Sequence, residues 1–211
     1  PEVPPAHLAF ADTIRAAGAE PVEEFGVLTG EVAGLEVCRV VTDPHTGEQR
    51  LDVGIGADDR EMFKMMHGSE PTQEALADVV RFVGAQRVPG APRHPLNLLA
   101  QERLLRVRLA AEPGVIGASS VVPTSPPVPR PNLTGPVPCV AVATVEGREV
   151  AVVCSVGVDL DVVPYAIDAC AALGLEECLL AVPARDALPV QHRLAALARA
   201  RITVVGIDAV A

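Results

Sequence analysis

The clearest folding signal in these 211 residues lies between Val137 and Gly157, where two β-branched apolar runs flank a Glu146-Gly147 pair. Such an arrangement is typical of a β-hairpin with a tight turn. If those two residues form the loop, the register places Cys139 of the first strand opposite Cys154 of the second. The sequence therefore predicts a hairpin with a pair of cysteines near its open end.

We expect Cys139 and Cys154 to be reduced thiols in contact, with both side chains on one face of the sheet. A Cα separation of roughly 5.5 Å would permit a disulfide, but a reducing compartment disfavours one. A helix signal follows the hairpin, with Asp159 or Asp161 as the N-cap and Gly174 as the C-terminal stop. We expect the two thiols to pack against this helix as small apolar groups.

The composition is that of a folded globular protein, with 49% hydrophobic and only 2% aromatic residues. The five cysteines have no C-x-x-C spacing and no histidine at zinc-site distance, which indicates buried free thiols. No apolar run approaches the roughly 18–20 residues that a membrane span requires, and residues 1–24 have no leader pattern of a basic followed by an apolar segment. We therefore expect a cytoplasmic protein that makes no membrane contact.

The net charge of −10 is unevenly distributed along the chain. Residues 1–88 contain 16 acidic and 7 basic side chains, whereas residues 89–211 contain 11 and 10. Because an acidic surface repels phosphates, a nucleic-acid partner is not expected without a local basic patch. The one candidate patch, which a solvated helix face explains equally well, consists of Arg93, Arg103, Arg106 and Arg108.

The proline-broken segment 87–95 predicts a boundary between residues 1–88 and residues 89–211. The first region is expected to be α+β, with a short helix over 7–18, a polar linker over 20–24, a hairpin within 35–56, and helices over 58–67 and 72–86, the second with Thr72 as its N-cap. The first of these two helices contains Met62, Met65 and Met66. We interpret them as core, with an exposed partner surface as the alternative.

The second region is expected to be α/β, with a mixed sheet flanked by helices. Besides the hairpin, the pattern predicts a helix over 96–111, a strand over 115–122, an irregular proline-rich loop over 123–136, a helix over 161–173, a strand over 177–182, a helix over 188–200 and a strand over 202–207. The alternation near the end predicts that the last two strands are parallel and joined by a right-handed crossover.

The element order from Leu96 to Ile207 resembles that of the restriction-endonuclease-like fold of the PD-(D/E)XK nucleases, and its local texture resembles the RecB-like and NERD-like branches. In that family a helix bearing a Glu leads to a strand and then a hairpin. The hairpin supplies an Asp and an E-x-K, and the next helix carries a Gln or Tyr near its start. The resemblance implies that the matching positions in this chain are Glu102, Cys139, Cys154, Val156 and Tyr165.

The departures from the family pattern predict that nuclease chemistry is lost. Mg²⁺ requires hard carboxylate oxygens, whereas the thiols of Cys139 and Cys154 are soft ligands, and Val156 supplies neither charge nor proton. We therefore expect no catalytic residue, no metal and no cofactor. The predicted role is that of a pseudo-nuclease acting through a protein partner or as a homodimer.

One alternative from another class remains open. An enzyme or a redox-responsive protein could use the Cys139/Cys154 pair or the acidic residues Asp159 and Asp161, although capping of the next helix also explains the aspartates. The sequence contains no G-x-S-x-G, Walker A or H-E-x-x-H motif that would indicate another kind of active site.

Overall fold

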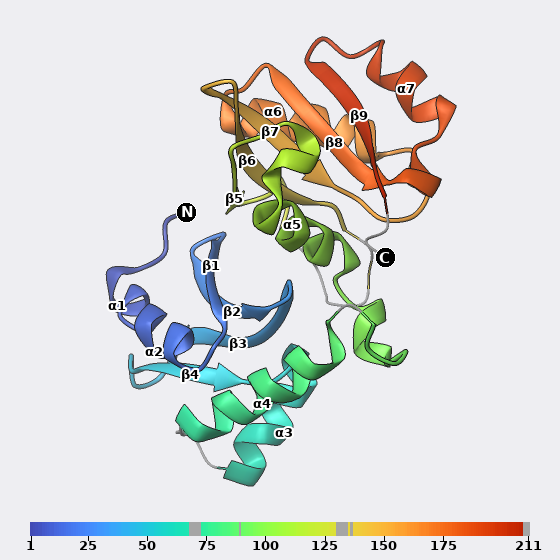
Figure 1. The fold of residues 1–211 in the computed structure, drawn as a ribbon. Coiled ribbons are helices and arrows are strands. Elements are labelled where there is room, and N and C mark those ends of the chain that lie inside the picture. The colour runs from blue at the N-terminus through green and yellow to red at the C-terminus, as the bar shows by residue number, and fades with distance from the viewer. Residues whose placement is uncertain (68–72, 89, 130–134, 136, 209–211) are drawn as a thin grey trace. The chain divides into compact units, whose positions relative to one another are not determined.

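The computed structural model describes residues 1–67, 73–88, 90–129, 135 and 137–208. The chain divides into two compact units, residues 1–99 and 100–211 (Figure 1). Both units combine helices with a β-sheet, so the mixed α/β class predicted from the sequence is confirmed. No helix in the described part of the chain has both the length and the hydropathy needed to cross a bilayer.

The proline-broken segment that follows Gln86 stays with the first unit, so the division falls after Leu99 and not after residue 88. Arg87 is the reason. Its side chain is buried and donates hydrogen bonds to the carbonyl oxygen of Ala33, and to those of Leu96 and Leu99 at 2.6 and 2.9 Å. The Arg87 side chain thereby joins the residues just after the proline-broken segment to the turn between β2 and β3 of the first sheet.

The first unit contains a four-stranded antiparallel sheet with the strands in sequence order, namely β1 (Glu20–Glu24), β2 (Val27–Val32), β3 (Leu35–Thr42) and β4 (Gln49–Val53). The predicted hairpin within residues 35–56 is confirmed by the pairing of β3 with β4. The linker expected over 20–24 was wrong, because this segment is the edge strand β1. Its Val22 is buried, and charged residues such as Glu20 suit an exposed edge.

The helices of the first unit are α1 (Pro5–Leu8), α2 (Ala11–Ala16), α3 (Gly56–His67) and α4 (Gln73–Gln86). Helix α4 buries Leu76, Val80 and Val83, and both α3 and α4 contact the sheet. The proposed N-cap at position 72 lies outside the described residues. The methionines of α3 are exposed rather than buried, so their interpretation as core was wrong: Met62, Met65 and Met66 are 61%, 78% and 69% exposed.

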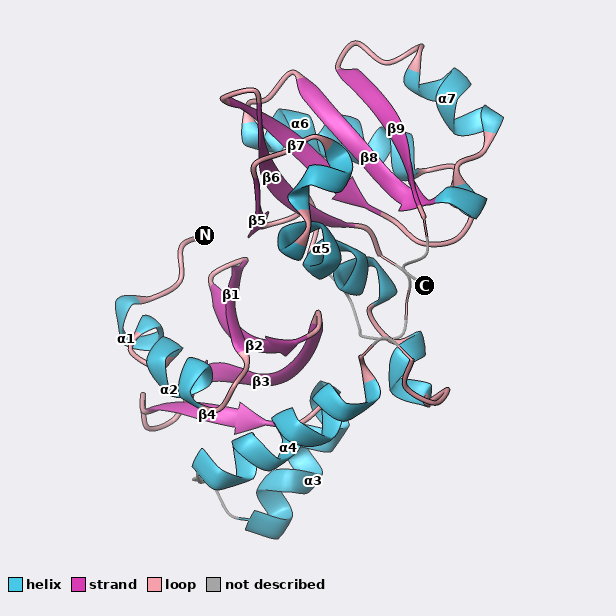
Figure 2. Cartoon of the chain, in the orientation of Figure 1, coloured by secondary structure: helices cyan, strands magenta, loops and turns pink. Residues whose placement is uncertain are grey.

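The second unit contains a five-stranded mixed sheet in the order β5 (Ser120–Thr124), β6 (Cys139–Val145), β7 (Arg148–Cys154), β8 (Glu177–Pro183) and β9 (Arg201–Ile207). Strands β5 to β7 are antiparallel neighbours, whereas β8 is parallel to β7 and β9 is parallel to β8 (Figure 2). The predicted parallel pairing of the last two strands is therefore confirmed.

Helices cover both faces of this second sheet (Figure 2). Helix α5 (Gln101–Ala111) packs on one face through Leu105 and Leu109. Helices α6 (Val162–Leu173) and α7 (Pro189–Ala195) pack together on the other face. The predicted C-terminal stop of α6 is confirmed, because Gly174 adopts the left-handed conformation with φ of 67°.

Several boundaries in the second unit differ from the sequence prediction. The helix expected over 96–111 begins only at Gln101, because Ala100 has a φ of 48° and separates it from a 3-10 turn at Pro95–Leu98. The strand expected over 115–122 is β5, which starts later because residues 113–116 form another 3-10 turn. Pro123 lies within β5, and an edge strand tolerates a proline because its outer side needs no donor.

Candidate functional site

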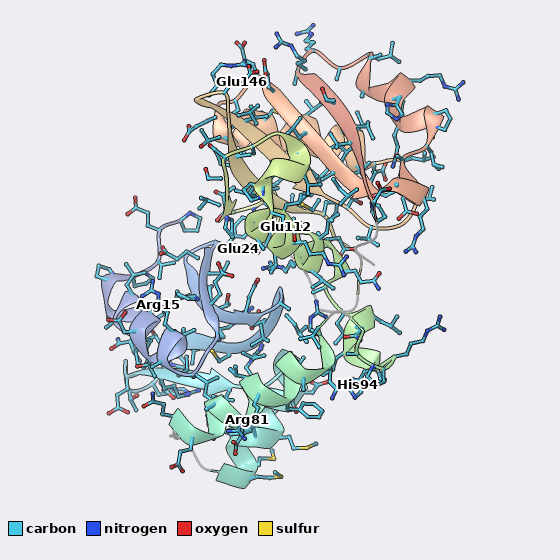
Figure 3. All side chains as sticks on the ribbon, viewed as in Figure 1. Arg15, Glu24, Arg81, His94, Glu112 and Glu146 are labelled. Atoms are coloured by element: carbon cyan, nitrogen blue, oxygen red, sulfur yellow. The ribbon has the colours of Figure 1, made fainter. Side chains whose placement is uncertain are left out.

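Cys139 on β6 and Cys154 on β7 are register partners, as the two-residue loop predicted. Figure 3 shows Glu146 at the turn that joins the two strands, where Glu146 and Gly147 both have positive φ. The two cysteines are 2% and 0% exposed, and their thiols are hydrogen-bonded to each other. All five cysteines of the chain are free, so the expectation of reduced thiols in contact agrees with the structure.

The thiol pair faces helix α5, so the expected packing against the helix over 161–173 was wrong. Cys139 and Cys154 share a buried cluster with Leu105 and Leu109 of α5. Their chain neighbours point to the opposite face, where Val153 packs with residues of α6. Strand alternation fixes which residues share a face, but it does not determine which helix covers that face.

A buried arginine lies close to this thiol pair. Arg106 of α5 is 0% exposed and donates a hydrogen bond from Nη1 to the carbonyl oxygen of Val140 at 3.2 Å. Its charge favours the Cys154 thiolate, but the hydrogen bond that the Cys154 thiol donates to Cys139 and the burial of the group outweigh it and raise the pKa of Cys154 well above its ordinary value. The Cys154 thiol is therefore neutral at physiological pH and unsuited to nucleophilic attack.

Glu102, the acid on the leading helix, is also buried, one turn before Arg106 on the same face of α5. The suggested arginine patch is not a single exposed face, because Arg103 is half-buried, Arg106 is fully buried and Arg108 is exposed. The spacing of residues in the sequence indicates which of these arginines is buried. The buried residues of α5 follow one helical stripe that runs through Glu102, Leu105, Arg106 and Leu109.

Of the five predicted site positions, the structure brings Cys139, Cys154 and Val156 together in one apolar cluster. Val156 is half-buried and packs against the cluster that contains Cys139 and Cys154. Tyr165 belongs to the opposite face, where it packs with the α6 cluster. Its hydroxyl donates a hydrogen bond to the carbonyl oxygen of Pro138 at 2.7 Å and so reaches the residue before β6, not the thiols.

The acidic pair before α6 is explained by local backbone bonding. Asp159 accepts a hydrogen bond from the backbone N–H of Asp161 at 2.8 Å through Oδ1. Asp161 occupies the N-cap position of α6, as predicted, although its side chain makes no capping hydrogen bond. Within the described ranges, no group of three or more His, Cys, Asp or Glu side chains is arranged to hold a metal ion.

Sequence reasoning missed two buried polar residues near the carboxyl ends of the parallel strands. Asp186 accepts a hydrogen bond from the backbone N–H of Gly157 at 2.8 Å, which joins the loop after β7 to the 3-10 turn after β8. Gln191 accepts one from the backbone N–H of Leu188 at 3.0 Å and caps α7. Open α/β sheets usually bind ligands at this end, but here these two side chains bond the backbone. No local motif marks either residue.

Comparison with protein-family models, with curated proteins and with solved structures finds no match for this chain. The fold and the buried cluster define a two-unit α/β protein with a thiol pair beneath α5.

Proposed function

We propose that the second unit is a restriction-endonuclease-like domain without the catalytic residues, and that the chain acts through protein interaction or self-association. The element order supports the resemblance, because a leading helix, a strand, a hairpin, a helix and a strand follow one another from α5 to β8. The parallel pairing of β8 with β9, which the alternation of elements predicted, is also compatible with that fold.

The observation that carries the proposal is the pair of buried thiols. Cys139 and Cys154 match the positions of the two metal-binding acids in the family, and they share one face of the sheet beneath the helix that bears Glu102. Thiols bind Mg²⁺ poorly, and a thiol whose pKa is raised by a hydrogen bond to its neighbour and by burial is a poorer ligand still. Val156, at the lysine position, offers no charge to stabilise a transition state.

The arginines of α5 do not favour a nucleic-acid partner. Arg106 is buried in the core of the second unit and cannot reach a phosphate. Three arginines of the suggested patch are left, namely the half-buried Arg103 and the exposed Arg108 on α5 and the exposed Arg93 in the first unit, and so few cations give little affinity at physiological salt. A protein partner fits an acidic protein better than a nucleic acid does.

The test is a cleavage assay with stoichiometric protein, single- and double-stranded DNA and RNA, and Mg²⁺ or Mn²⁺. We expect no turnover and no heat of Mg²⁺ binding in calorimetry. Light scattering across a range of protein concentrations would report self-association. Metal-dependent cleavage that is lost in the variant Glu102→Gln but kept in Glu112→Gln would overturn the proposal, because it would place a working metal site beside α5.

The contact between the two thiols favours a second candidate, a redox response. In this reaction hydrogen peroxide takes two electrons and two protons from the thiols of Cys139 and Cys154. The two sulfur atoms form one disulfide, and the peroxide is reduced to two water molecules. The burial of both thiols opposes this reaction. Mass spectrometry after exposure to peroxide distinguishes the candidates, because a disulfide lowers the intact mass by about two hydrogen masses.

A further inference from the structure

Helix α3 exposes every methionine of the chain on one of its faces. The sequence contains three methionines, and Met62, Met65 and Met66 are all in this helix. Positions three and four residues apart lie side by side on a helix, and each of these side chains is more than 60% exposed. Single exposed apolar residues are ordinary, but three adjacent ones form a continuous apolar surface. We call these three residues the methionine face.

The opposite side of α3 attaches the helix to the first sheet. Arg60 donates a hydrogen bond to Glu36 of β3 at 2.8 Å, and both side chains are largely buried. Phe63, one turn further along the same side, is half-buried. The methionine face is therefore not needed to dock α3 on its own unit.

The charge around this face restricts what can cover it. Three exposed acids of α3, Asp58, Asp59 and Glu61, accompany one exposed cation, Lys64. Across residues 1–88, acidic side chains outnumber basic ones by 16 to 7. Repulsion between like charges disfavours a second copy of this unit, and the same repulsion disfavours anionic lipid and nucleic acid. A cationic apolar partner is attracted instead.

From this charge complementarity we propose that the methionine face binds a cationic amphipathic helix of a partner protein. Methionine side chains are flexible and polarisable, so they adapt to the irregular apolar face of such a helix. The acids of α3 attract the lysines or arginines that flank that apolar face. The inference rests on the proposed role of the chain as an interaction protein, and it names the chemistry of the partner.

The methionine content makes a direct test possible. Protein labelled with ¹³C at the methionine methyl groups gives signals only from the methionine face. The probe is a synthetic amphipathic helix of leucine and lysine, about 14 residues long. It is compared with a leucine and glutamate helix of the same pattern, and with a lysine and glycine peptide of the same charge. We expect saturable shifts of the methionine signals with the leucine and lysine helix alone.

A matched pair of variants separates apolar contact from charge. The variant Met62→Gln, Met65→Gln, Met66→Gln keeps the net charge, and we expect it to weaken binding of the leucine and lysine helix at least about tenfold. The control, Val115→Gln, Val158→Gln, Leu197→Gln, changes three residues that are also exposed, by 52%, 66% and 82%, and should bind as the parent does. Circular dichroism verifies that both variants are folded.

Four results would overturn the inference. These are equal binding of the lysine and glycine peptide, unchanged affinity in the methionine variant, methionine signals that shift with protein concentration alone, and signals that respond to anionic vesicles but not to the peptide. Signals that shift with protein concentration alone would assign the methionine face to a second copy of the chain. Cleavage of nucleic acid would instead end the non-catalytic role proposed above without moving the methionine signals, so the two failures are distinguishable.

Discussion

Gly30 of β2 lies opposite Cys38 of β3 so closely that a Cβ at position 30 would be 2.5 Å from the Cys38 sulfur. The same Cβ would be 2.9 Å from Cγ2 of Ile14, which is fully buried. The approach of these three residues leaves no room for a methyl group. It explains a glycine in the interior of a strand, where glycine is otherwise unfavourable.

The variant Gly30→Ala should therefore lower the free energy of unfolding by about 1–3 kcal/mol, the usual range for overpacking. Gly84→Ala in α4 is the matched control, because a Cβ at position 84 would meet only Cγ1 of Val32, at 3.8 Å. We expect that variant to gain about 0.5–1 kcal/mol from helix propensity. Urea denaturation measures both values. Equal stabilities of the two variants would contradict the packing around Gly30.

Burial raises the pKa of the Cys38 thiol from 9.0 to about 12, with a smaller contribution from the charge of Glu36. Between these values the unfolded chain loses the proton while the folded chain keeps it. The stabilising contribution is therefore complete below pH 9 and is lost as the pH rises toward 12, by at most about 1.4 kcal/mol per pH unit.

The variant Cys38→Ala should show a shallower loss of stability above pH 9 than the parent, although it will be less stable at pH 7 because it leaves a small cavity. Urea denaturation at pH 7, 9 and 10 in the presence of a reductant gives the two slopes. A residual slope is expected because the pKa values of Cys154 and Cys178 are also raised. Parallel curves for parent and variant would show that Cys38 ionises as freely in the folded protein as in the unfolded one.

Arg106→Ala should destabilise the protein by about 3 kcal/mol, because it leaves a cavity in the core and removes the donor to the Val140 carbonyl. Arg108→Ala removes the same side chain from an exposed position of the same helix, and we expect a change within about 0.5 kcal/mol. Thermal unfolding of the two variants provides the comparison. A similar small effect in both would mean that Arg106 is accessible to water.

None of the five cysteines should react with an aromatic disulfide reagent in the native protein at pH 8, because all of them are buried. All five should react after denaturation in guanidinium chloride, which is the internal control for reduced thiols. A thiol that reacts rapidly in the native protein would support the redox candidate only if it is Cys139 or Cys154, because the pKa of Cys170 is itself lowered by its hydrogen bond with Cys178. The variants Cys139→Ala and Cys154→Ala would then show which of the pair is responsible.

The sequence predicted best where a short loop fixed the geometry. The Glu146-Gly147 turn determined the register that places Cys139 opposite Cys154, and this register is confirmed. The identity of the covering helix was wrong, because it depends on long-range packing rather than on strand periodicity. Long-range packing also decides whether the apolar face of a helix such as α3 is buried or exposed, because the amphipathic sequence pattern is the same in both cases.

Polar residues were predicted least well. Arg106 was expected on a solvated face because arginine is rarely fully buried, yet the helical stripe that it shares with Leu105 and Leu109 faces the sheet. Strand β1 was predicted to be a linker because three of its five residues are acidic and only one position, Val22, is buried, so its sequence has no clear strand pattern. Local composition was outweighed in the first case by packing of α5 on a sheet distant in the sequence, and in the second case by the pairing of β1 with its neighbour β2.

The proline in β5 also bears on how this protein avoids aggregation. Exposed sheet edges are templates onto which another molecule can add a strand, and Pro123 interrupts the row of amide donors at the β5 edge. The opposite edge is β9, whose seven residues all carry an amide hydrogen. Arg201 donates its N–H to Glu176 beside β8, so by strand alternation the N–H of Val204 faces the open side of β9. If partly unfolded molecules polymerise through this sheet, we expect the intermolecular ladder to start at β9, and the variant Val204→Pro should slow fibril formation.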